Sequence, residues 1–221
     1  MRSLALAIGL VQLAAGLCAG AELSSSKEYA DAIHATPDLE HGGQIFRSRC
    51  EMCHGTNGEG YPGGTAAAFP ETGGQHFRVL VLALVRFRHG YGSTHGMQYF
   101  SNASRLAAAQ DVADVAAYVA ALQPASAVGM GTGRSLGEGA RAYFRCCESC
   151  HGPTGEGDAT RPVPRLAGQH YRYLLSQLNA PADAQRNDDL HTRRIQRLSV
   201  ADREAVADYL SRLLRPFAHG D

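Results

Sequence analysis

Two stretches decide the fold: Cys147-Glu148-Ser149-Cys150-His151 and its earlier twin Cys50-Glu51-Met52-Cys53-His54. Each follows the pattern C-x-x-C-H, which attaches a c-type haem. Two thiols one helical turn apart can both add to the vinyl groups of one porphyrin, and the His that follows reaches the iron as its proximal ligand. Zinc binding, a disulfide and thiol redox chemistry are alternatives for a C-x-x-C pair. Two complete motifs in one short chain favour two covalently bound haem c groups.

The N-terminus of the 221-residue chain has the features of a secretory signal. Arg2 precedes an apolar run from Leu4 to Leu17, and Ala19-Gly20-Ala21 fits a cleavage site. We therefore expect residues 1–21 to be removed on export, which predicts a periplasmic protein. An uncleaved membrane anchor is the alternative, because the apolar run is near the lower length limit for a membrane span.

Length and composition allow two small domains. About 200 residues would remain after cleavage, which suits two domains of about 100 residues each. The formal net charge is zero, so no nucleic-acid partner is implied. Of six cysteines, one lies in the signal and four lie in the haem motifs, which leaves Cys146. This residue is either a thiol available for disulfide formation or a small buried residue beside a haem.

In both halves a glycine stands four residues ahead of an aromatic residue, and the first motif cysteine follows four residues later. The residues are Gly42, Phe46 and Cys50 in the first half, and Gly139, Tyr143 and Cys147 in the second. This spacing places all three on one face of a helix. It predicts a helix that runs into each haem motif, with a notch at the glycine where another helix can cross closely.

The residues that follow each motif also repeat. Gly58-Glu59-Gly60 begins four residues after His54, and Gly155-Glu156-Gly157 begins four residues after His151. Glycines at these positions let the backbone wrap the edge of a haem. A second repeated triplet, Gly-Gln-His, begins at Gly74 in the first half and 94 residues later in the second. The haem motifs are 97 residues apart, so the first loop holds three extra residues.

Helical patterns account for the rest of each half. Each Gly-Gln-His triplet begins a helical stretch, 77–84 or 171–178, and the first is more apolar than a surface helix needs. That excess predicts a contact with the other domain or with a partner. Each half then ends in an amphipathic helix, 111–122 or 202–213. Residues 22–37 are polar, and we expect a loose lead-in with at most one helical turn.

No strand pattern competes with these helices, so the sequence predicts an all-α protein made of two tandem copies of one haem domain. We expect a signal peptide over residues 1–21 and a first domain over 22–123. A linker rich in Gly, Ala and Ser covers 124–135, and the second domain covers 136–221.

A low-spin electron carrier needs a second axial ligand on each iron, and Met and His are the usual choices. Met52 lies inside a haem motif and Met130 lies in the linker, which leaves Met97 as the candidate for the first iron. His95 and His89 are rival ligands there.

The second half has no methionine after its haem motif. Adding the 94-residue offset to Met97 leads to His191, which is therefore the candidate sixth ligand of the second iron. The alternatives are a five-coordinate iron or ligation by His170 or His219.

These features resemble the dihaem cytochromes c of the cytochrome c4 type, over essentially the whole mature chain. The resemblance rests on the two C-x-x-C-H motifs and on the Gly-Gln-His-x-x-x-Leu stretches. It rests also on Phe87-Arg88-x-Gly90 ahead of Met97 and on the terminal Asp-x-x-x-x-Ala-x-Tyr helices. It implies two class I cytochrome c domains that pack about a pseudo-twofold axis with their haems close together. Members are periplasmic electron carriers, soluble or membrane-attached, that can feed terminal oxidases.

Carried onto this chain, the resemblance implies the following haem contacts: Cys50 and Cys53 hold the first haem with His54 and Met97 on its iron, and Cys147 and Cys150 hold the second with His151 as proximal ligand. The family has Met on both irons, so His191 departs from it. The family also has Pro-x-Leu before Gly-Gln. Pro164-Arg165-Leu166 fits this pattern, and Pro70-Glu71-Thr72 fits it in part.

The sequence thus predicts an electron-transfer protein rather than an enzyme. A His/His second haem would have a lower potential than a His/Met first haem, so electrons would enter at the second domain and leave from the first. We expect redox proteins as donor and acceptor, such as a terminal oxidase or a dehydrogenase subunit, and membrane association only through an uncleaved signal or a membrane-bound partner.

Two alternative functions remain. One is a haem subunit bound to a dehydrogenase through the apolar stretch 79–84, as in the similar cytochrome subunit of flavocytochrome c sulfide dehydrogenase. The other is an enzyme with an open site at the second haem, beside Cys146.

Overall fold

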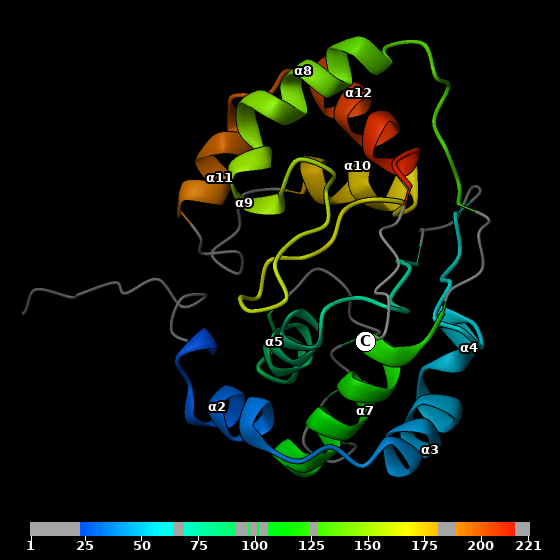
Figure 1. The fold of residues 1–221 in the computed structure, drawn as a ribbon, viewed down its shortest axis with the longest axis vertical. Helices are drawn as coiled ribbons and strands as arrows, with labels where there is room; N and C mark the ends of the chain where they lie inside the picture. Colours follow the sequence, from blue (N-terminus) through cyan, green and yellow to red (C-terminus); the bar gives the residue numbers. More distant parts are fainter. Residues whose placement is uncertain are drawn as a thin grey trace, which may run out of the picture.

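The structure, a computed structural model, describes residues 23–63, 69–91, 97, 101, 106–123, 128–180 and 189–214, with the backbone alone for 189–191. The expected signal peptide, residues 1–21, lies outside these ranges. Two helical lobes are stacked with extended segments between them (Figure 1). Among the described residues, no helix is both long enough and apolar enough to span a bilayer.

The first lobe contains five of the described helices: α2 (Lys27–His34), α3 (Leu39–Arg49), α4 (Glu51–His54), α5 (Phe77–Arg88) and α7 (Ala109–Ala121). The second contains α8 (Leu136–Cys146), α9 (Glu148–His151), α10 (Tyr171–Asn179), α11 (Asp189–Gln196) and α12 (Val200–Ser211). The only β pairings in the described part are isolated bridges, one in each lobe. The expected all-α class is confirmed.

Each lobe is built on a close helix crossing, α3 on α7 and α8 on α12 (Figure 1). The expected glycine notches lie at these crossings. A Cβ atom at Gly42 would collide with the carbonyl oxygen of Asp114, and one at Gly139 would collide with that of Ala205. The aromatic residues one turn later, Phe46 and Tyr143, are fully buried. The crossing therefore fixes the helix that leads into each C-x-x-C-H motif.

Replacing Gly139 with Ala should lower the free energy of unfolding by about 1–3 kcal/mol, because the added methyl group forces α8 away from the backbone of α12. Gly137→Ala is the matched control on the same helix. A Cβ at Gly137 meets only the Arg141 guanidinium at 3.5 Å, so this change should be neutral or stabilising. Urea unfolding followed by far-ultraviolet circular dichroism measures both, and equal stabilities would contradict the crossing.

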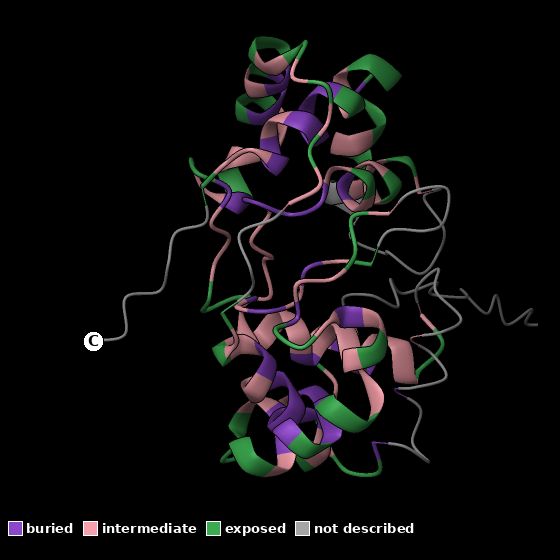
Figure 2. Cartoon of the chain, turned by 90° about the vertical axis from the view of Figure 1, so that its right-hand side faces the viewer, coloured by how far each residue is buried: buried purple, intermediate pink, exposed green. Residues whose placement is uncertain are grey.

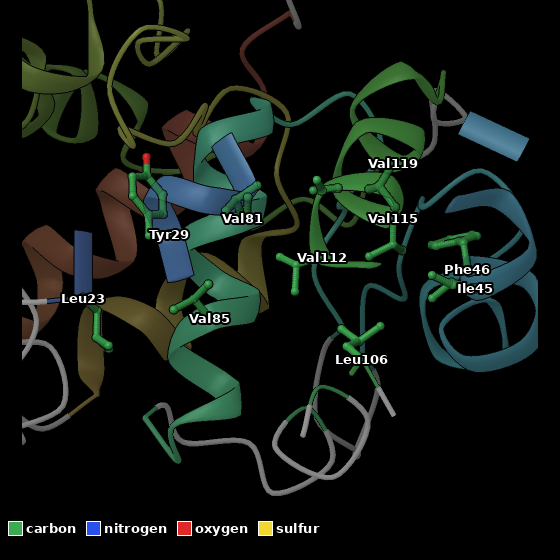
Figure 3. Packing of buried hydrophobic residues seen from close by; sticks show 13 residues of the cluster. Leu23, Tyr29, Ile45, Phe46, Val81, Val85, Leu106, Val112, Val115 and Val119 are labelled. Carbon is green, nitrogen blue, oxygen red and sulfur yellow. The ribbon is translucent and has the colours of Figure 1, made fainter. Parts of the chain in front are cut away.

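The described part of the expected lead-in, residues 23–37, forms more structure than its polar composition predicts. The Ser26 hydroxyl accepts a hydrogen bond from the amide of Tyr29 and caps α2, which runs for eight residues. Tyr29 and Ala32 are buried on one face of this helix, against α5 and α7. Figure 3 shows Tyr29 beside Val81 of α5. The expected loose lead-in is wrong, because two residues one turn apart bury a helix that is otherwise polar.

The same packing accounts for the apolar excess of α5. Val81 and Val85 are fully buried, and Leu80, Leu82 and Leu84 pack against the first core. This helix lies between α2 and α7 and contacts both. Part of its apolar surface is therefore covered within its own lobe, and the other apolar side chains of α5 remain half-buried.

Candidate haem centres

The first haem motif forms a single helical turn. The amide of Cys50 donates to the carbonyl of Phe46 at the end of α3, and the amide of His54 donates to the carbonyl of Cys50 at 2.9 Å. The half-buried thiols of Cys50 and Cys53 are not joined in a disulfide. Two free thiols and an imidazole are thus held on one short helix, as attachment of a haem c requires.

The second motif repeats this geometry. The amide of Cys147 donates to the carbonyl of Tyr143, and that of His151 donates to the carbonyl of Cys147 at 3.0 Å. The thiols of Cys147 and Cys150 are also free. The two motifs therefore present the same donor set in the same local conformation.

Burial and one hydrogen bond prepare each motif histidine to bind iron. His54 and His151 are 7% and 6% exposed, and burial lowers the pKa of both rings although a backbone hydrogen bond opposes it. Nδ1 of His54 lies 3.4 Å from the carbonyl oxygen of Pro70, and Nδ1 of His151 lies 2.9 Å from that of Pro164. A neutral ring that donates from Nδ1 carries its lone pair on Nε2, as a metal-bound histidine does.

The same burial keeps the first cysteine of each motif protonated. It raises the pKa of Cys50 to about 11 and the pKa of Cys147 to about 12. Zinc binds thiolates, whereas thioether formation starts from thiols. No cluster of three or more His, Cys, Asp or Glu side chains is placed to hold a metal ion in the described part of the chain. The donor sets fit haem better than zinc.

A glycine loop closes each attachment segment, as the repeat predicts. The amide of Gly60 donates to the carbonyl of His54, and the amide of Gly157 donates to that of His151, both at 2.8 Å. These glycines have φ values of 70° and 75°, a left-handed conformation that residues with a Cβ atom rarely adopt. The loop thus returns the chain directly beneath the proximal histidine.

The Gly-Gln-His triplets do more than begin helices, because their glutamines join the two lobes. Gln75 donates to the carbonyl of Arg165 and accepts from its amide, at 3.0 and 2.9 Å. Gln169 forms the same two bonds with Glu71, both at 2.8 Å. Gln169 is 94 residues after Gln75, and Arg165 is 94 residues after Glu71. Each lobe therefore makes on the other the same contact that it receives, as a twofold relation between the lobes requires.

The histidines of the triplets add a second reciprocal pair. Nε2 of His76 bonds the carbonyl of Glu156 at 2.7 Å, and Nε2 of His170 bonds that of Glu59 at 2.8 Å. In each lobe, the triplet histidine therefore binds a backbone carbonyl in the glycine loop that follows the haem motif of the other lobe. Figure 2 shows buried residues on the extended segments between the lobes as well as inside them. The resemblance implied a pseudo-twofold packing of the two domains, but the sequence did not indicate which residues form its contacts.

Two rival iron ligands are engaged elsewhere. Nδ1 of His170 accepts from the amide of Gly129 at 3.1 Å while Nε2 contacts the opposite lobe, so neither nitrogen is directed to a haem. Nε2 of His89 lies 2.8 Å from a carboxylate oxygen of Glu28 on α2. His95 and His219 lie outside the described residues.

Met97 and His191 are described in unequal detail. Met97 is half-buried, and its carbonyl accepts a hydrogen bond of 2.5 Å from the hydroxyl of the buried residue Ser101. Met130 is 53% exposed, which agrees with its exclusion as a ligand. His191 lies near the start of α11, and its side chain is outside the described part.

The helix that carries His191 is anchored to the second haem motif. Nη1 of Arg194 donates to the hydroxyl of Ser149 at 2.5 Å and to the carbonyl of Cys146 at 3.3 Å. Cys146 itself is half-buried and packs against the second core. It therefore occupies the place of a small packing residue at the end of α8.

Comparison with known proteins decides the family. A family model described as cytochrome c matches residues 39–123 and 136–214, and each segment contains one C-x-x-C-H motif. The chain belongs to the cytochrome c family. With two matched domains it is of the dihaem cytochrome c4 type and carries two covalently bound haem c groups, as the resemblance implied.

Individual relatives agree with this assignment. Cytochrome c4 of Pseudomonas aeruginosa is 32% identical over 194 residues, which cover 81% of this chain and 90% of that protein. The thiosulfate dehydrogenase electron acceptor of Stutzerimonas stutzeri is 31% identical, over 73% of this chain and 77% of its own length. The crystal structure of cytochrome c4 from Pseudomonas stutzeri is similar, with a TM-score of 0.66 at 27% identity over 81% of this chain and all of that one. The present cytochrome is thus a dihaem electron carrier.

Proposed function

We propose that this carrier works in the periplasm with two unlike haems, His54 and Met97 binding the first iron and His151 and His191 binding the second. The proposal includes removal of residues 1–21, domains over 22–123 and 136–221, and a linker over 124–135. The bound haems would supply the one-electron chemistry. The protein would orient each proximal imidazole through its Nδ1 hydrogen bond, and its sequence would determine which side chain binds the other face of each iron.

The observation that carries the proposal is the equivalence of the two attachment segments. Their cysteines, histidines and Pro carbonyl acceptors match in conformation and in hydrogen-bond partners, although the Nδ1–carbonyl distance is 3.4 Å in the first and 2.9 Å in the second. With the same proximal groups on both irons, the sixth ligand is the main chemical difference, and the repeat aligns Met97 with His191. Because Met raises the potential relative to His, the second lobe would accept electrons and the first would deliver them to a redox protein.

Spectra of the oxidised protein test the ligand assignment. We expect two low-spin signals by electron paramagnetic resonance, one typical of His/Met ligation and one of bis-His ligation. A separate redox titration of the two haems should then give the lower potential for the second. A high-spin signal in the wild type that His191→Ala leaves unchanged would overturn the assignment of His191 and favour the open-site enzyme.

A second candidate function follows from one group of relatives. Two are named as electron acceptors of thiosulfate dehydrogenase, and a thiosulfate dehydrogenase structure from Marichromatium purpuratum matches with a TM-score of 0.65 at 30% identity, over 40% of that chain. The donor to this cytochrome would then be a sulfur-compound dehydrogenase. Stopped-flow mixing of the oxidised cytochrome with a thiosulfate dehydrogenase and thiosulfate tests this, and haem reduction no faster than with thiosulfate alone would argue against it.

A further inference from the structure

Helix α2 lies outside the residues that match the cytochrome c family, which begin at residue 39. It is nevertheless part of the first core. Tyr29 is 5% exposed and Ala32 is fully buried, and the helix packs on both α5 and α7. Figure 3 places Leu23 and Tyr29 on the α5 side of this core. A helix outside the matched region is thus packed into the first core as closely as the helices inside it.

The first turn of α2 makes a specific polar contact with the end of α5. Oε1 of Glu28 lies 2.9 Å from Nε of Arg88, and Oε2 lies 2.8 Å from Nε2 of His89. The Glu28 and Arg88 side chains are only 22% and 11% exposed, so solvent screens their charges less than those of a surface pair. The Glu28 carboxylate thus forms an ion pair with Arg88 at the end of α5 and a hydrogen bond with His89 at its C-cap, while Oε1 has no hydrogen-bond partner among the described residues.

The end of α5 is in turn the start of the segment that leads to Met97. Gly90 adopts a φ of 78° and its amide donates to the carbonyl of Phe87, while the amide of Tyr91 donates to the carbonyl of Arg86 at 2.9 Å. Tyr91 packs against the first core. Met97 follows only six residues later. Whatever fixes the end of α5 therefore limits where the chain enters the Met97 segment.

We propose that α2 is a positioning element for the sixth ligand of the first haem, with Glu28 as the positioning residue. By binding Arg88 and His89 together, Glu28 fixes the end of α5 and so favours the backbone path that brings Met97 to the iron. This inference rests on the proposed ligation by Met97.

The second lobe lacks such a contact in its described part. The segment that precedes α8 bonds the beginning of α10 instead of its end, with the carbonyl of Gly129 accepting from the amide of Tyr171 at 2.8 Å. Among the described helices, α2 contacts the C-terminal end of α5 through Glu28, and no such side-chain contact to the end of α10 is seen. This asymmetry matches the asymmetry of the proposed ligands, since a thioether binds ferric iron more weakly than an imidazole and depends more on being held in place.

Imidazole binding to the oxidised protein tests the inference, because imidazole competes with Met97 for the first iron. Glu28→Gln keeps the volume of the side chain and removes its charge. We expect this variant to bind imidazole at the first haem about tenfold more tightly than the wild type. This factor corresponds to a loss of about 1.4 kcal/mol in the stability of the state in which Met97 binds the iron. The second haem of the same molecule is an internal reference and should be unaffected.

Two further variants separate positioning from general stability. Asp31→Asn removes a carboxylate from the same helix, at an exposed pair with Lys27, and should bind imidazole as the wild type does. Arg88→Gln should reproduce the effect of Glu28→Gln, whereas Arg88→Lys should restore most of the wild-type affinity. If Glu28→Gln and Asp31→Asn give equal affinities, the positioning role is wrong.

The near-infrared charge-transfer band of methionine-ligated ferric haem distinguishes this failure from failure of the ligand assignment. A wild-type protein without that band would remove Met97 as ligand and the inference with it. A wild-type protein that has the band, together with an unchanged Glu28→Gln affinity, would remove the inference alone.

Discussion

Replacing Met97 with His is expected to lower the reduction potential of the first haem by tenths of a volt, within the span of about 0.8 V that axial ligands and their surroundings set. An imidazole stabilises ferric iron better than a thioether does, so the first haem would approach the proposed state of the second. Separate optical redox titration of the two haems measures the change. The charge-transfer band of methionine ligation should disappear at the same time.

The converse change, His191→Met, is the matched experiment, because the repeat aligns these two positions. It should raise the potential of the second haem and bring it towards that of the first. For electrons passing from the second lobe to the first, each 59 mV removed from the gap lowers the driving equilibrium about tenfold. If neither substitution moves the potential of its own haem, the repeat has aligned residues that do not bind iron.

The attachment segments could be predicted from the sequence because their chemistry is local. Cys50, Cys53 and His54 lie within one helical turn, so spacing alone determines which atoms can reach one haem. The glycine notch at Gly139 was equally accessible, since it depends only on a residue without a side chain one turn ahead of an aromatic. Where a feature depends only on residues close together in the chain, their spacing is enough to predict it.

Helix α2 could not be predicted in the same way. Its composition is polar, and only Tyr29 and Ala32 on one face are deeply buried. Whether such a short helix forms depends on what it packs against, since an isolated helix of this length is marginal in water. The apolar excess of α5 was the available signal, but it indicated only that something covers α5. It did not indicate that the cover is the segment at 27–34.

The resemblance implied that the two lobes pack together, but the contacts between them could not be predicted, for a related reason. Its hydrogen bonds join residues that are 80 to 111 positions apart, and a repeat shows which residues are equivalent but not which ones meet. Thr72 stands where the Pro-x-Leu pattern has Leu, yet the carbonyl of Pro70 still contacts the proximal His54 and Glu71 bonds Gln169 of the other lobe. The partial match to the family pattern therefore did not predict either the contact of Pro70 with His54 or that of Glu71 with Gln169.

Arg165→Ala is the second substitution with a large expected effect. Its guanidinium donates to the carbonyls of Gly74 and Gly73 at 2.6 and 3.0 Å and lies 3.4 Å from the Glu71 carboxylate. The two side chains are 11% and 2% exposed. Removing the cation from a buried ion pair costs about 3–5 kcal/mol, because a buried carboxylate loses its counter-charge. We expect the lobes to separate and to unfold in two transitions, which urea titration and small-angle X-ray scattering would detect.

The twofold relation between the lobes supplies a control that a general loss of stability cannot imitate. Glu71 and Arg165 occupy equivalent positions, so the double variant E71R/R165E places the same pair across the interface with its charges reversed. The new guanidinium at position 71 would face the second lobe at Ala167 and Gly168, the counterparts of Gly73 and Gly74. Each single reversal should separate the lobes as Arg165→Ala does, and the double variant should restore a single transition. A double variant that is no more stable than the single ones would show that the two side chains do not act as a pair.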